Sequence, residues 1–219
     1  MSRRDRGPIP RLAGSVILAA ARAVTGVRAF WTGLAPTPGQ RIYYANHASH
    51  LDFLLVWVCL PPALRGAVRP VAGADYWLAS PLKRFVGRDV FDAVLIDRDR
   101  SGALTAPVER MSEALSDGSS LIVFPEGTRN IGDEPLLPFN TGLFHLSPAR
   151  PDVDCVPVWI ANLNRVMPKG EILPVPLVCT VTFGAPLRAQ PGEEKADFLA
   201  RARAALLALA PSACGEAGA

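Results

Sequence analysis

The chain of 219 residues has no long uninterrupted apolar segment. Its longest charge-free runs, residues 53–64 and 172–187, are broken by prolines, and no stretch reaches the roughly 18 uncharged apolar residues that a membrane span requires. The formal charge of +3 is too small to indicate nucleic-acid binding. Hydrophobic residues nevertheless make up 49% of the chain, and the mean hydropathy is +0.20. The composition therefore favours attachment to a membrane surface over membrane spanning.

Cysteine and histidine are scarce, and their spacing argues against several common kinds of site. The four cysteines show neither metal-type nor redox-type spacing, and three lie in apolar runs, so we expect reduced core thiols and a reducing compartment. His47 and His50 are close in sequence, but no third ligand stands at a suitable spacing, so no metal site is predicted. No serine or cysteine stands in a nucleophile elbow, so a covalent nucleophile is not predicted.

Helical and strand-like patterns alternate along most of the chain. This alternation predicts an α/β fold, in which a single layered domain with a largely parallel or mixed sheet is flanked by helices and preceded by an N-terminal amphipathic helix. The predicted strands are residues 41–45, 68–72, 93–97, 120–124, 153–161 and 177–183. The predicted helices are residues 11–31, 52–60, 76–85, 103–116 and 193–208, with a further short helix that begins at residue 142.

The composition of the two ends divides the chain into three parts. Residues 1–35 are predicted to form a basic arm and an amphipathic helix at a membrane surface. Residues 36–210 form the main domain, and residues 211–219 are predicted to be a flexible tail.

The predicted N-terminal helix, residues 11–31, has arginines on one side and apolar residues such as Leu12 and Val16 on the other. The pattern fits first a helix that covers the core, and it also fits an interfacial anchor with its apolar side in lipid. A signal peptide, with residues 12–21 as its apolar part and residues 19–21 as its cleavage site, is a third interpretation. The sequence leaves these interpretations open.

Residues 46–52 (Asn-His-Ala-Ser-His-Leu-Asp) place His47 and Asp52 five residues apart, where a predicted strand gives way to a helix. Imidazole is the side chain whose ordinary pKa suits proton transfer near neutral pH, and a carboxylate on its far nitrogen fixes the tautomer. The pair is therefore a candidate general base for activating a hydroxyl. Ser49 and Asp52 also match a capping box, in which Asp52 stabilises a helix start and His47 is a loop residue. The two roles are compatible.

Polar residues follow directly after three of the predicted strands. His47 follows the first strand, Arg98 the third, and the run from Glu126 to Arg129 the fourth. The carboxyl ends of parallel strands share one edge of an open sheet, where ligands bind. Chain order thus brings a candidate base and two arginines to one edge, which suggests an acceptor with a hydroxyl to activate and a phosphate to hold. Taken alone, Arg98 also fits a solvated charge run, and the Glu126 segment fits an ordinary turn.

Four motifs, in the expected order, resemble those of the glycerolipid and lysophospholipid acyltransferases, the family of bacterial 1-acylglycerol-3-phosphate acyltransferase. Residues 46–52 resemble the first motif, and residues 124–129 (Phe-Pro-Glu-Gly-Thr-Arg) resemble the third residue for residue. Residues 94–98 (Val-Leu-Ile-Asp-Arg) resemble the second, and residues 156–160 (Val-Pro-Val-Trp-Ile) resemble the fourth. The similarity spans residues 41–183 and identifies the main domain as an acyltransferase catalytic domain.

The resemblance implies transfer of a fatty acyl group from acyl-CoA or acyl-carrier protein to the free hydroxyl of lysophosphatidic acid, which gives phosphatidic acid in phospholipid biosynthesis. It implies no metal or organic cofactor, because the thioester is a co-substrate. His47 is the implied base, and Asp52 orients it. Glu126 is expected to hold the glycerol hydroxyl or the arginine geometry. The implied substrate-binding residues are Arg98, Glu126, Gly127, Thr128 and Arg129, and the implied acyl-site residues are Val156, Pro157 and Val158.

Two positions depart from the family pattern. Asp92 stands where the second motif usually begins with glycine, and Asn140 replaces a lysine that often follows the third motif ahead of a glycine. Both positions fall near the expected acceptor, so they bear on the identity of the acceptor more than on the type of reaction.

The expected partners are a lysophospholipid, a thioester donor and a membrane surface, without nucleic acid. The expected location is peripheral or monotopic, on the cytoplasmic face of a bacterial cell membrane. One alternative is an acyltransferase for another lysophospholipid or a lyso-aminolipid. A second is a non-catalytic lipid-binding protein of the membrane surface, and a third is a thioesterase or lipase in which water replaces the acceptor.

Overall fold

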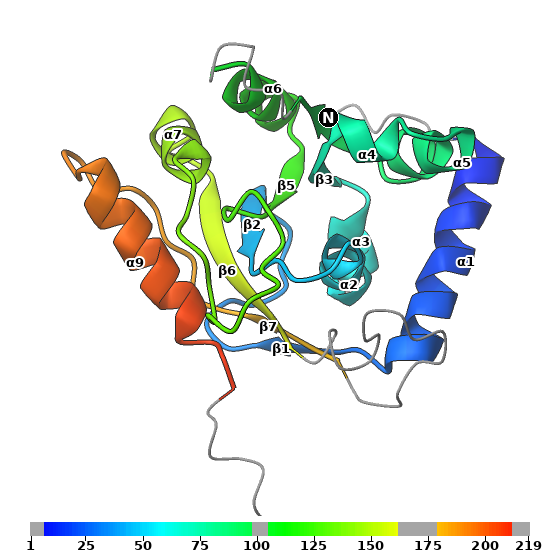
Figure 1. The fold of residues 1–219 in the computed structure, drawn as a ribbon, viewed down its shortest axis with the longest axis horizontal. Helices are drawn as coiled ribbons and strands as arrows, with labels where there is room; N and C mark the ends of the chain where they lie inside the picture. Colours follow the sequence, from blue (N-terminus) through cyan, green and yellow to red (C-terminus); the bar gives the residue numbers. More distant parts are fainter. Residues whose placement is uncertain (1–6, 98–104, 162–178, 212–219) are drawn as a thin grey trace, which may run out of the picture.

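The computed structural model describes residues 7–97, 105–161 and 179–211, which form a seven-stranded sheet covered by helices on both faces (Figure 1). The strand order is β1-β7-β6-β2-β5-β3-β4. Neighbouring strands are parallel except β6 and β7, which are antiparallel. The predicted α/β fold with a largely parallel or mixed sheet is confirmed. The strands are β1 (Arg28–Trp31), β2 (Arg41–Ala45), β3 (Val68–Gly73), β4 (Val94–Ile96), β5 (Ser120–Val123), β6 (Asp154–Ala161) and β7 (Thr180–Phe183).

The helices form two layers around the sheet. α1, α2 and the π-helical segment η1 pack on one face, and α6, α7 and α9 pack on the other (Figure 1). No helix in the described ranges combines the length and the apolar character needed to cross a membrane. The helical segments are α1 (Pro8–Thr25), α2 (Asp52–Cys59), α3 (Pro62–Arg65), α4 (Ala74–Trp77), α5 (Pro81–Arg84), η1 (Phe85–Val90), α6 (Thr105–Ser116), α7 (Gly142–Ala149) and α9 (Lys195–Leu207).

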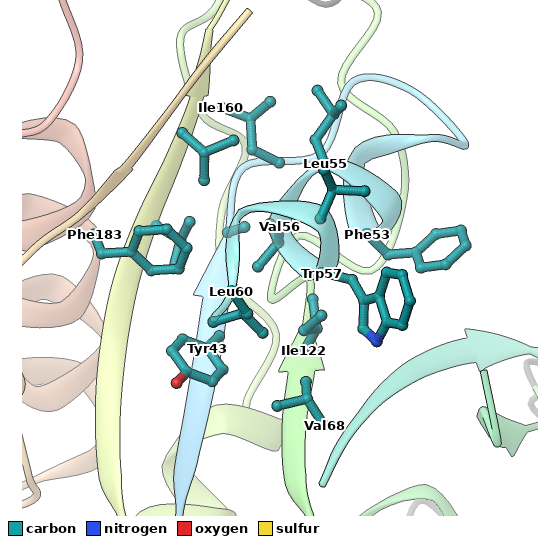
Figure 2. Packing of buried hydrophobic residues seen from close by; sticks show 14 of the residues in the cluster. Tyr43, Phe53, Leu55, Val56, Trp57, Leu60, Val68, Ile122, Ile160 and Phe183 are labelled. Atoms are coloured by element: carbon teal, nitrogen blue, oxygen red, sulfur yellow. The ribbon is translucent and has the colours of Figure 1, made fainter. Parts of the chain in front are cut away.

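The central strands are buried on both faces, which explains why they read as continuous apolar runs. Successive side chains of a strand point to opposite faces, so Tyr43 packs under α2 whereas Tyr44 packs under α9 and donates a hydrogen bond from its hydroxyl to the Ala202 carbonyl (3.1 Å). Figure 2 shows Val56 of α2 lying above Tyr43 and Ile122 of the sheet. The apolar side of α2 thereby fixes the helix that begins at Asp52.

The predicted helix over residues 11–31 is wrong beyond residue 25. α1 ends at Thr25, because Gly26 adopts a left-handed conformation (φ 53°) and its amide donates to the Arg22 carbonyl (3.0 Å). The chain then forms β1, which pairs with β7. Apolar residues continue across the glycine, so the periodicity alone did not reveal the change. The helix also begins earlier than predicted, at Pro8.

α1 packs on the core through a face that the sequence pattern misassigned. Ile17 and Leu18 contact the core. Leu12 and Val16 of the predicted apolar side are 67% and 59% exposed. One face of α1 therefore covers the core, while the predicted apolar face points away from it.

The predicted helix over residues 76–85 is divided into α4, α5 and the start of η1. Pro81 lacks the amide that a continuing helix needs, so a new helix begins there instead. The Ser80 hydroxyl caps α5 by accepting from the Lys83 amide (3.3 Å). Of the predicted strand 177–183, the first two residues lie outside the described residues.

Candidate active site

His47 and Asp52 form a close pair in the loop that joins β2 to α2. His47 Nδ1 lies 2.9 Å from Asp52 Oδ2, and the two side chains are 12% and 2% exposed. An ionised Asp52 holds the proton on Nδ1, which leaves Nε2 as the nitrogen that can accept a proton. This is the geometry that the spacing of the two residues predicted.

Asp52 also organises the start of α2. Its Oδ2 accepts from the amides of Ala48 (2.6 Å) and Ser49 (2.8 Å). The bond to Ser49 is one arm of the predicted capping box, but the Ser49 hydroxyl accepts from the Leu51 amide (3.3 Å) rather than from Asp52. A single buried carboxylate therefore holds both the helix start and the imidazole.

The main chain of His47 is held from the β5 side of the sheet. Its amide donates to Glu126 Oε1 (2.8 Å), and its carbonyl accepts from the Asn130 amide (2.7 Å). The other oxygen of Glu126 accepts from the Leu137 amide (2.8 Å). Burial raises the pKa of Glu126, while these two amides act in the opposite direction. Both oxygens of this 5% exposed carboxylate are thus committed to backbone amides, which favours a positioning role over the expected contact with the acceptor.

Two further side chains that the sequence analysis did not single out fix His47. The Phe124 ring stacks on the imidazole, with ring centres 4.2 Å apart and planes 22° apart. The Asn46 side chain bridges to β6, where Nδ2 donates to the Ile160 carbonyl (3.0 Å) and Oδ1 accepts from the Ile160 amide (2.8 Å). Both residues lie inside the quoted motifs, which is the only signal the sequence offered for them.

The turn after β5 brings Arg129 to the rim that carries His47. The Gly127 amide donates to the Phe124 carbonyl (3.0 Å), and Gly127 adopts φ 69°, where an added Cβ would collide with Asn140 Nδ2. Gly127, Thr128 and Arg129 are exposed. The hydrogen bond from Asn130, the next residue, to His47 ties this turn to the candidate base.

Arg98 lies outside the described residues. The strand before it, β4, is parallel to β3 at the margin of the sheet. Asp92, which departs from the family pattern, adopts the left-handed conformation (φ 51°) that glycine adopts readily. Arg69 supports this turn, because its Nε donates to the Asp92 carbonyl (2.7 Å) and lies 3.3 Å from Asp92 Oδ2. The departure therefore preserves the backbone conformation of a glycine.

The residues expected at the acyl site lie in the centre of the sheet. Val156 and Val158 of β6 are fully buried in the apolar cluster beneath α2. The Pro157 carbonyl accepts from the Gly184 amide (2.9 Å). Their contact with an acyl chain stays a prediction. Over the described ranges, no group of three or more histidine, cysteine, aspartate or glutamate side chains is arranged to hold a metal.

Fold and site together define an α/β protein with a histidine–aspartate pair at the carboxyl edge of its sheet, a site suited to general-base chemistry on a hydroxyl. The family model described as Acyltransferase matches residues 32–161, which is more than half of the chain. The chain therefore belongs to the acyltransferase family.

The sequence relatives include the 1-acyl-sn-glycerol-3-phosphate acyltransferase of Limnanthes alba, 29% identical over 163 residues, which are 71% of this chain and 53% of that protein. The protein of the same name from Helicobacter pylori is 29% identical over 122 residues, which are 55% and 48% of the two chains. The chain spans about half the length of these curated relatives. The crystal structure of the 1-acyl-sn-glycerophosphate (LPA) acyltransferase PlsC from Thermotoga maritima is similar with a TM-score of 0.67 at 20% identity, over 95% of this chain and 85% of that one, a likeness of fold.

Proposed function

We propose that this chain transfers a fatty acyl group from acyl-CoA or acyl-carrier protein to the free hydroxyl of lysophosphatidic acid, giving phosphatidic acid. The observation that carries the proposal is the contact between His47 Nδ1 and Asp52, which leaves Nε2 as the proton acceptor. The activity named for the sequence relatives supports lysophosphatidic acid as the acceptor.

The proposed reaction needs one base and no covalent enzyme intermediate. Nε2 of His47 takes the hydroxyl proton as the acceptor oxygen attacks the thioester carbonyl, and Asp52 stabilises the imidazolium that forms. The tetrahedral adduct then collapses, the carbon–sulfur bond breaks, and the imidazolium returns the proton to the departing thiolate. The products are the ester and the free thiol. No metal or organic cofactor takes part in this proposal.

Arg129 and Arg98 are the proposed ligands of the acceptor phosphate. An arginine fork matches phosphate oxygens and aligns the hydroxyl for attack, which lowers the entropic cost of the reaction. Gly127 and Thr128 shape the turn that presents Arg129. We assign Glu126 to positioning, since backbone amides occupy both of its oxygens. Val156, Pro157 and Val158 are the proposed lining of the acyl-chain site.

The test measures thiol release and labelled phosphatidic acid, with lysophosphatidic acid and acyl-CoA as substrates. His47→Ala is expected to lower turnover on the order of a hundredfold to ten-thousandfold without loss of fold. His145→Ala, at an exposed histidine of α7, is the matched control and should keep wild-type turnover. Full activity of the His47 variant would remove the proposal.

A second measurement separates the two roles of Asp52. Asp52→Asn keeps a side-chain oxygen for the loop amides but removes the charge that supports the imidazolium. We therefore expect a large loss of turnover and only a small change in melting temperature. If the variant only melts earlier and keeps its turnover, the capping role alone explains Asp52.

An acceptor panel tests the alternatives. Preferred acylation of another lysophospholipid or of a lyso-aminolipid would change the acceptor and keep the mechanism. Thiol release without any lipid acceptor would favour a thioesterase, and lipid binding without thiol release would favour a non-catalytic carrier.

We also propose that the outward face of α1 contacts a membrane surface. Ile9, Leu12 and Val16 are 70%, 67% and 59% exposed. Leu82 of α5 is 71% exposed, and α5 leads into η1, which packs against α1. Exposed apolar residues on an arginine-bearing helix suit an interface of lipid and water. A peripheral position on the cytoplasmic face of a bacterial membrane is part of this proposal.

Co-sedimentation with anionic vesicles tests the membrane contact. Leu12→Asp should reduce the bound fraction while leaving the melting temperature unchanged, because the side chain is exposed in the free protein. Ser15→Asp, at an exposed polar position of the same helix, is the matched control for added charge. Equal binding by wild type and both variants would contradict the proposal.

A further inference from the structure

β3 opens an additional loop at the edge of the sheet that carries the candidate site. It lies between β5 and β4 and is parallel to both, so its carboxyl end shares the edge used by β2 and β5. The chain leaves β3 at Gly73 and continues into α4 and α5. The segment from α4 to α5 therefore starts at the edge where His47 and Arg129 lie.

Three side chains form a column that connects this segment to the loop of His47. The Tyr76 ring of α4 stacks on the His50 imidazole, with ring centres 4.4 Å apart and planes 11° apart. The Lys83 ammonium of α5 lies 3.9 Å from the centre of the Tyr76 ring. His50 belongs to the same short loop as His47. Two successive ring contacts therefore join a cation on α5 to the loop that carries the candidate base.

The Tyr76 ring contacts the Lys83 ammonium without neutralising its charge. Ion pairs engage other cations such as Arg69 and Arg201, but within the part of the chain that the structure describes none engages Lys83. An aromatic face attracts an ammonium through its quadrupole and supplies no full negative charge. The ammonium thus stays available to an anionic ligand.

We propose that Lys83, supported by Tyr76 and His50, binds the phosphate of the acceptor and selects phosphomonoester over phosphodiester lysophospholipids. This inference rests on the acyl transfer proposed above. A phosphomonoester carries about −1.5 to −2 charges at pH 7, whereas a phosphodiester carries a single negative charge. The attraction between Lys83 and the acceptor grows with the charge on the phosphate, so this added cation stabilises the bound monoester more than the bound diester. Leu78 and Leu82 of the same segment are 39% and 71% exposed, which gives an amphiphilic acceptor an apolar surface beside the cation.

The experiment compares lysophosphatidic acid with lysophosphatidylglycerol at a fixed, saturating concentration of acyl-CoA. Lys83→Met removes the charge and keeps the length of the side chain, and Lys83→Arg restores the charge. Arg84→Met is the matched control, because Arg84 is the exposed neighbour on α5, whereas the cation that lies over the Tyr76 ring is Lys83. Tyr76→Phe keeps the ring, whereas Tyr76→Leu removes it.

Lys83→Met is expected to raise KM for lysophosphatidic acid about tenfold, the size of one charge-assisted hydrogen bond to phosphate. Its kcat, its KM for acyl-CoA and its melting temperature should stay at the wild-type values, and the preference for the monoester should fall. Lys83→Arg should recover most of that preference. Tyr76→Leu should resemble Lys83→Met, and Tyr76→Phe should resemble the wild type.

Several results would overturn the inference. An equal rise of KM for both acceptors would deny the monoester selection, and a rise of KM for acyl-CoA would move the cation to the donor site. The same effect in Arg84→Met would reduce Lys83 to general surface charge. If the wild type acylates lysophosphatidic acid and Lys83→Met keeps its KM, this inference alone fails. If the wild type does not acylate it, the proposed function fails first.

Discussion

A substitution at Glu126 distinguishes two roles for this residue, which are positioning of the candidate base and direct binding of substrate. Its carboxylate is 5% exposed and accepts from the amides of His47 and Leu137, each at 2.8 Å. Glu126→Gln keeps one accepting oxygen but turns an NH₂ group toward the second amide, which already is a donor. A buried amide left without an acceptor costs about 1–3 kcal/mol. For a chain of this length, about 2 kcal/mol corresponds to a fall of about 4–8 °C in melting temperature.

The same substitution should slow catalysis without weakening the acceptor complex. Loss of either bond loosens the side chain that holds the main chain of His47, and a displacement of about 1 Å can cost about a hundredfold in rate. We therefore expect Glu126→Gln to lower kcat about tenfold to a hundredfold, with KM for lysophosphatidic acid within about twofold of the wild type. Steady-state kinetics and thermal melts measure both effects on the same preparation.

Stability as a function of pH gives an independent reading of the same carboxylate. Because burial raises the pKa of Glu126 in the folded protein, the folded state holds its proton more tightly than the unfolded state does. The resulting stabilisation is present at acid pH and is lost as the pH rises through the folded-state pKa. The stability advantage of the wild type over Glu126→Gln should therefore be largest at acid pH. A variant that raises KM for the acceptor while keeping kcat and melting temperature would refute the positioning role and restore direct substrate contact.

Three further predictions test individual features of the structure. Gly127→Ala should lose about 1–3 kcal/mol of stability and much of its turnover, because φ is 69° and the added Cβ meets a neighbouring side chain. Gly118→Ala is the control, since Gly118 has φ 82° but open space around it; equal losses in both variants would show that the steric contact at Gly127 has no effect. Asp92→Gly should stay within about 1 kcal/mol of wild type in urea unfolding, since relief of the left-handed conformation offsets the lost pair with Arg69. Burial raises the pKa of the Cys59 thiol to about 12, so peptide mapping after alkylation at pH 8 should show slower labelling than in the unfolded chain; equal rates would contradict this.

The fold was predictable wherever a segment carries its own signal. β5 is a short run of apolar residues stopped by Pro125, and it was found in the sequence for that reason. β1 was missed because its four residues follow Gly26 without a separate pattern and gain their partner only from β7, far along the chain. The antiparallel pairing of β6 with β7 has no local signal either. Sheet order depends on contacts that no window of sequence contains.

The site was predictable in its chemistry and less so in its support. The sequence spacing of His47 and Asp52 predicts the hydrogen bond between them, because His47 lies in the short loop that leads directly into the helix beginning at Asp52. The partners of Glu126 are backbone amides, which every residue has, so no residue type marks them. The sequence shows the charge of Glu126 but not its burial, so it could not distinguish a positioning role from a contact with substrate.

The residues that hold His47 in place come from different strands. The position of His47 in the first motif therefore depends on residues of the third motif. Asn46 ties the end of β2 to Ile160 of β6, while Phe124 and Glu126 hold the ring and the main chain from β5. β2 pairs with β6 on one side and with β5 on the other, in registers fixed by side chains buried on both faces. The candidate base therefore takes its position from the alignment of three central strands and not from its own loop alone. Because a shift of β5 against β2 would displace Phe124 and Glu126 together, the alignment of the sheet is itself a condition for the proposed catalysis.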